Sequence, residues 1–128
     1  MSVWKRKAIE CLPELKKDFE QPGTSIYDIF MEMLPAVVSA HKTNDTARLQ
    51  KIYGFAERCF QQKENELWNA AGVAFYEHLG DNEETLKEMS AWVKPTIYTN
   101  IRGLLALRLG ESEIEKLDQM YGVKPMKY

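Results

Sequence analysis

The clearest structural pattern in this chain lies in residues 25–38, whose sequence is Ser25-Ile26-Tyr27-Asp28-Ile29-Phe30-Met31-Glu32-Met33-Leu34-Pro35-Ala36-Val37-Val38. Its apolar residues recur three and four positions apart, which places them on one face of an α-helix. Ser25 followed by Asp28 resembles a capping box, so we expect the helix to begin there. Pro35 interrupts the apolar stripe, and we expect it to kink the helix or to split it into two.

Similar apolar stripes cover most of the remaining sequence. They predict helices over residues 3–19 (broken near Pro13), 44–60, 67–79, 81–93, 95–109 and 112–121. No segment alternates apolar and polar residues for long enough to predict a strand. The short connections predict an all-α fold of six or seven antiparallel helices. Their arrangement is either an irregular bundle or a short HEAT- or armadillo-like stack.

Length and composition limit the possible protein classes. The chain has 128 residues with 45% hydrophobic and 28% charged side chains, which is typical of one folded domain over residues 1–128. Residues 123–128 are expected to form a loose tail. The net charge of −2 argues against direct nucleic-acid binding. No apolar run is long enough to span a membrane and no secretory signal follows the N-terminus, so we expect a cytoplasmic protein without a membrane partner.

The sequence contains no recognisable catalytic or metal-binding pattern. Phosphate-binding glycine loops and nucleophile elbows are absent. The two cysteines, Cys11 and Cys59, lack metal-type spacing and are expected to be reduced, buried thiols. An enzyme would require His41 or His78 to lie in a pocket with a carboxylate partner, and the more economical interpretation of both is a structural histidine. We therefore expect no catalytic residue, no cofactor, no metal and no enzymatic activity.

The charge distribution is more informative than any motif. An acidic run lies between residues 77 and 88, which contain one lysine, Lys87, and five carboxylates: Glu77, Asp81, Glu83, Glu84 and Glu88. Carboxylates are favourable at helix starts, which explains part of the run. The alternative is an acidic surface directed at a basic partner. Three aromatic residues lie near this run in the helical pattern, either in the core or as surface anchors for a partner: Trp68, Tyr76 and Trp92.

Four segments also resemble a known group of proteins. They are Cys11-Leu12-Pro13-Glu14-Leu15-Lys16, Ser25-Ile26-Tyr27-Asp28-Ile29-Phe30, Leu49 to Phe60, and Asn69-Ala70-Ala71-Gly72-Val73-Ala74-Phe75-Tyr76-Glu77-His78-Leu79. They are similar to a family of small all-helical bacterial proteins encoded beside secreted polymorphic toxins. The resemblance covers about residues 8–80 and does not extend into the last third of the chain.

The resemblance implies an immunity protein, as in contact-dependent growth inhibition. Such a protein binds the C-terminal domain of one cognate toxin and neutralises it in the cytoplasm, and a further host factor can join the complex. Many of these toxins are nucleases that act on RNA, tRNA or DNA, and an acidic helical face can occupy their basic substrate grooves. The alternative function is a helical adaptor or regulatory scaffold with no toxin partner.

Overall fold

The computed structural model describes residues 2–122, and this part of the chain is helical without a strand. The all-α class is therefore confirmed. The expected loose tail, residues 123–128, lies outside the described residues. Eight α-helices form the structure: α1 (Val3–Cys11), α2 (Lys16–Phe19), α3 (Ile26–Lys42), α4 (Thr46–Phe60), α5 (Asn65–Ala70), α6 (Glu83–Trp92), α7 (Pro95–Leu109) and α8 (Glu111–Met120).

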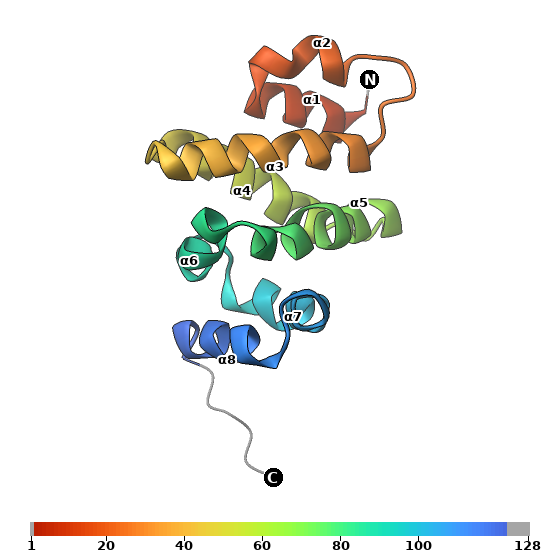
Figure 1. Cartoon of the computed structure of the whole chain (residues 1–128). Helices are drawn as coiled ribbons and strands as arrows, with labels where there is room; N and C mark the ends of the chain where they lie inside the picture. Colours follow the sequence, from red (N-terminus) through yellow and green to blue (C-terminus); the bar gives the residue numbers. More distant parts are fainter. Residues whose placement is uncertain (1, 123–128) are drawn as a thin grey trace.

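Three shorter helical segments complete the chain. They are the 3₁₀ turn η1 (Pro13–Leu15), the π-helical segment η2 (Ala71–Phe75) and the 3₁₀ segment η3 (Tyr76–Asp81). The expected break near Pro13 is confirmed, and counting α1 and α2 as separate helices gives one more than the six or seven expected. The elements succeed one another along the molecule, with α1 and α2 at one end and α7 and α8 at the other (Figure 1).

Most of the expected helix starts are confirmed. In α3, the Ser25 hydroxyl accepts from the backbone N–H of Asp28 at 3.2 Å, and the Asp28 carboxylate accepts from the N–H of Ser25 at 2.9 Å. The side chain of Asp45 caps α4, and Pro95 occupies the first turn of α7. The expected start of the last helix at Ser112 is wrong. That helix begins at Glu111, directly after a Gly110 in the left-handed region with φ of 83°.

Of the two expected effects of Pro35, a kink or a split, the split is wrong, because α3 continues from Ile26 to Lys42. Proline lacks an N–H, so the carbonyl of Met31 loses its usual helical donor. Both Met31 and Pro35 lie on the exposed side of the helix, where water can satisfy that carbonyl. The buried residues Phe30 and Val37 anchor the two halves of α3 in the same core.

The hydrophobic core is built around α3. The ring of Phe30 lies 5.5 Å from those of Phe55 on α4 and Phe75 on η2, both in tilted geometry. Burial of each such side chain contributes about 2–3 kcal/mol to folding. The core continues towards α7 and α8 through Met89, Tyr98, Ile101, Leu105, Ile114 and Leu117. One continuous set of apolar contacts therefore positions α6, which carries most of the acidic run.

A polar cluster fastens α8 to the rest of the molecule. The carboxylate of Asp118 accepts from the hydroxyl of Tyr98 at 2.6 Å and from Nε and Nη2 of Arg102 at 2.9 and 2.6 Å. This guanidinium holds the pKa of Asp118 below its usual value. The ring of Tyr121 stacks on Tyr98, and its hydroxyl donates to the carbonyls of Met89 and Val93. The end of α6 is thereby held in place.

We expect Asp118→Ala to lower the free energy of unfolding by about 2–3 kcal/mol. Breaking a buried ion pair costs about 3–5 kcal/mol, and the exposure of the Arg102 side chain reduces the effect. Glu115→Ala is the matched control, because this residue is an exposed acid on the same helix; its effect should stay within about 0.5 kcal/mol. Urea denaturation measures both variants, and equal losses would contradict the role of Asp118.

Candidate functional site

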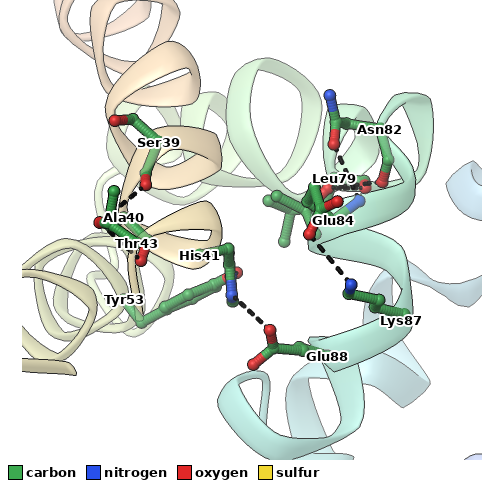
Figure 2. Close-up of polar contacts among 11 residues, drawn as sticks. Ser39, Ala40, His41, Thr43, Tyr53, Leu79, Asn82, Glu84, Lys87 and Glu88 are labelled. Carbon is green, nitrogen blue, oxygen red and sulfur yellow. Dashed lines mark hydrogen bonds and ion pairs between the residues drawn. The ribbon is translucent and has the colours of Figure 1, made fainter. Parts of the chain in front are cut away.

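The start of α6 is fixed by local hydrogen bonds. The side chain of Asn82 accepts from the backbone N–H of Glu84 at 2.9 Å. The buried hydroxyl of Thr85 donates to the carbonyls of Leu79 and Asn82. Figure 2 shows these contacts beside the acidic residues of α6. The helix expected from residue 81 therefore begins two residues later, at Glu83, after a cap at Asn82.

The five acidic candidates do not share one environment. Asp81 is exposed but already paired, because its carboxylate accepts from Nε and Nη2 of Arg108 at 3.1 and 2.6 Å and lies 2.8 Å from Nδ1 of His78. The hydrogen bond from Arg108 is the main cause that lowers the pKa of Asp81. Glu77 is half-buried and Glu83 is exposed. The structure therefore assigns Asp81 an internal partner rather than a free surface charge.

Glu84, Glu88 and Trp92 form one line on α6. They lie four residues apart, so their side chains share a helix face. Glu84 pairs with Lys87, whose Nζ lies 3.0 Å from its Oε2. Glu88 is directed instead towards His41 at the end of α3 (Figure 2). We call Glu84, Glu88 and Trp92 the α6 stripe.

The histidine facing the α6 stripe is fully enclosed. The side chain of His41 has an exposed fraction of 0%, and its Nε2 lies 2.7 Å from the hydroxyl oxygen of Tyr53. Its Nδ1 lies 3.5 Å from Oε1 of Glu88 and has no hydrogen-bond partner among the described residues. A distance of 3.5 Å is too long for a well-formed hydrogen bond. One buried polar atom therefore points at Glu88 without being satisfied by it.

The aromatic rings of Tyr53 on α4 and Trp92 on α6 pack beside His41. The indole of Trp92 stacks on the ring of Tyr53 at a centroid distance of 5.5 Å and an angle of 16°. Its edge contact with His41 has a centroid distance of 6.4 Å. Residues from α3, α4 and α6 thus meet at one point. Sequence reasoning treated His41 as structural and did not connect it with Glu88, since no local spacing links these two segments.

The electrostatic environment keeps His41 neutral at pH 7. Burial is the main cause that lowers its pKa, and the nearby Glu88 carboxylate opposes that effect. Burial raises the pKa of Tyr53, so its phenol keeps its proton. The negative charge of Glu88 favours a proton on Nδ1 of His41, and the Tyr53 hydroxyl then donates to Nε2. Glu88 consequently carries a charge that the neutral histidine does not balance.

Two of the aromatic candidates lie away from the α6 stripe. Tyr76 is 1% exposed and packs edge-on against Phe60 and Phe75, so of its two expected placements the core is confirmed and the surface anchor is wrong. The π-helical turn η2 precedes it and changes the residues per turn, which rotates Tyr76 into the core. Trp68 is 42% exposed and lies on α5, beside a hollow that reaches Leu104 of α7.

The remaining reactive side chains are inaccessible or dispersed. Cys11 and Cys59 are free and buried, and burial raises their pKa values to about 11 and about 12. Both thiols therefore stay protonated at neutral pH. Among residues 2–122, no three His, Cys, Asp or Glu side chains are grouped closely enough to hold a metal ion. In the same range, no helix combines the length and apolar character that a bilayer crossing requires.

We expect acidification to destabilise the native protein through His41. In the unfolded chain this histidine takes up a proton near pH 6.5, whereas the folded site takes it up only at lower pH. The unfolded state then binds more protons, so the free energy of unfolding falls as pH drops below about 6.5, by at most about 1.4 kcal/mol per pH unit. His41→Gln should remove this part of the slope in urea denaturation between pH 8 and 5. Identical slopes in both proteins would contradict the expectation.

Comparison with known proteins gives a family but no activity. No curated protein and no solved structure matches this sequence. Residues 6–106 match a family described as "Domain of unknown function (DUF7674)", and that description mentions neither a toxin nor an immunity protein. Since the match spans most of the 128 residues, the chain belongs to the DUF7674 family.

Proposed function

We propose that this chain is an immunity protein that neutralises the C-terminal domain of a cognate toxin by stoichiometric binding. The observation that carries the proposal is the α6 stripe, in which two carboxylates and a half-buried tryptophan share one helix face. Charged groups of this kind accelerate encounter with an oppositely charged surface. An aromatic ring beside them supplies the apolar contact that retains the partner.

The proposed contact surface includes only some of the carboxylates of the acidic run. It contains the α6 stripe and the exposed Glu83, with Glu77 at its margin. Asp81 is excluded because two hydrogen bonds hold its carboxylate against Arg108 of α7, and Tyr76 is excluded because it is buried. A toxin with a basic substrate groove is the complementary partner, and a nuclease has such a groove because it binds phosphates. The chain would act without a catalytic residue or cofactor, in the cytoplasm of the producing cell.

We also propose that the helices form a short HEAT- or armadillo-like stack rather than an irregular bundle. The succession of elements from α1 to α8 along the molecule supports this arrangement (Figure 1). Stacked helices give a rigid surface, and rigidity lowers the entropic cost of binding.

The alternative function, a helical adaptor without a toxin partner, is favoured by a second surface. A hollow of about 380 Å³ lies between α5 and α7, and its wall includes Trp68, Val73 and Leu104. This hollow is lined by none of the residues of the α6 stripe. An adaptor needs two contact surfaces, whereas a simple inhibitor needs one.

Co-purification with the product of the gene immediately upstream tests the immunity function. We expect a one-to-one complex and protection of cells that express the toxin domain. No complex together with no protection would contradict the immunity function. A complex that lacks any toxic component would instead support the adaptor.

A variant in which three carboxylates of α6 are replaced by neutral amides tests the proposed contact surface. Glu83→Gln, Glu84→Gln and Glu88→Gln together should lower the association rate with that partner by about tenfold or more at low salt. The matched control is the triple change of Glu111, Glu113 and Glu115 to Gln on α8, which removes the same charge elsewhere. Stopped-flow kinetics measures both variants. Equal rates for the two would show that α6 is not the steering surface.

A further inference from the structure

Glu88 is a half-buried carboxylate without a cationic partner. Its side chain is 34% exposed. Within residues 2–122, the one basic side chain at ion-pair distance from it is His41, which is neutral at pH 7. The adjacent Lys87 is engaged by Glu84 at 3.0 Å. A charge that is partly withdrawn from water and left unpaired costs free energy, so this position favours binding of a cation.

The chain does not supply that cation from its own arginines. Three of them already form ion pairs with other acids: Arg48 with Glu14, Arg102 with Asp118, and Arg108 with Asp81. The other two, Arg6 and Arg58, lie on α1 and α4 and form no ion pair with Glu88. No lysine of residues 2–122 forms an ion pair with Glu88 either, so the described residues leave this carboxylate open to a cation from a partner.

A second, independent observation points to the same position. Nδ1 of His41 is buried, lacks a hydrogen-bond partner and is directed at Glu88. A small movement of Glu88 towards His41 would complete this hydrogen bond, since the two atoms are 3.5 Å apart. His41 would then donate a hydrogen bond to one oxygen of the Glu88 carboxylate, and the other oxygen would be available to a ligand. Buried polar atoms without partners are rare in folded proteins, so the gap at this contact requires an explanation.

We propose that Glu88, His41 and Trp92 form a binding site for a single arginine side chain of a protein partner. Glu88 accepts the guanidinium, and His41 positions the carboxylate. Trp92 offers the part of its indole that Tyr53 does not cover. This proposal deepens the proposed function and rests on it in one respect: the α6 stripe must face another protein.

The chemistry of the site selects arginine over other cations. A guanidinium is planar, so it can hydrogen-bond to a carboxylate and at the same time lie against an aromatic ring. The ammonium of lysine is more strongly hydrated and lacks the flat face. A metal ion would need at least one more ligand, and the described residues provide no group of three.

The test uses the full chain and a capped Gly-Arg-Gly peptide as the probe. Binding is followed by NMR through the ring resonances of His41 and the indole N–H of Trp92. We expect both signals to shift and saturate with the arginine peptide. The same peptide with citrulline, which has the shape of arginine but no charge, should bind at least about tenfold more weakly. A lysine peptide should fall between the two.

Variants of the protein provide the second comparison. Glu88→Gln should weaken binding of the arginine peptide by about tenfold. Glu115→Gln is the matched control, because it removes the same charge from an exposed position on α8, outside the proposed contact surface, and binding should stay within about twofold. The comparison of arginine with citrulline on the unchanged protein remains decisive even if Glu88→Gln does not fold.

The outcomes separate this proposal from the proposed function. Equal binding of the arginine and citrulline peptides would overturn the arginine site, as would equal losses in Glu88→Gln and Glu115→Gln. A toxin complex found alongside either result would leave the immunity function standing. Selective arginine binding without any toxin complex would support the site and contradict the immunity function.

Discussion

The burial of a neutral histidine between a tyrosine and a glutamate is the constraint on which the candidate site depends. His41 joins α3 to α4 through its contact with Tyr53, and it faces α6 through Glu88. A charged imidazole in this position would neutralise Glu88 from within the protein. A neutral one leaves the carboxylate available to a ligand. The same enclosure that keeps the ring uncharged therefore gives the surface of α6 its unbalanced charge.

The rest of the structure serves to hold α6 against this histidine. The core around Phe30 connects α3 with α4 and η2, and α6 packs on α3. At the other end of α6, the hydroxyl of Tyr121 donates to the carbonyls of Met89 and of Val93, which follows the helix. Asp118 accepts a hydrogen bond from Tyr98 of α7 and fastens α8 there. The stripe of Glu84, Glu88 and Trp92 is thus presented on a helix supported at both ends, as a rigid recognition surface requires.

Local sequence signals predicted the helices well because their causes are local. The apolar spacing of residues 26–38 and the Ser25–Asp28 capping box specify α3 without help from distant residues. The sequence left Tyr76 open between core and surface, because the preceding π-helical turn changes the helical periodicity that would otherwise decide its placement. The pairing of Asp81 with Arg108 and the approach of Glu88 to His41 join distant segments, which no spacing rule relates. The acidic run was visible in the sequence, but its division into paired and unpaired charges was not.

The pKa of His41 in the folded protein tests the central claim most directly. An NMR titration of its ring resonances measures this value without any partner or substitution. The account predicts a pKa below the ordinary histidine value of 6.5, because burial disfavours the imidazolium more than Glu88 stabilises it. A pKa above 6.5 would mean that Glu88 stabilises the imidazolium more than burial disfavours it, so that the two groups pair within the protein. The carboxylate would then have no unbalanced charge to offer a partner, and the account would be contradicted.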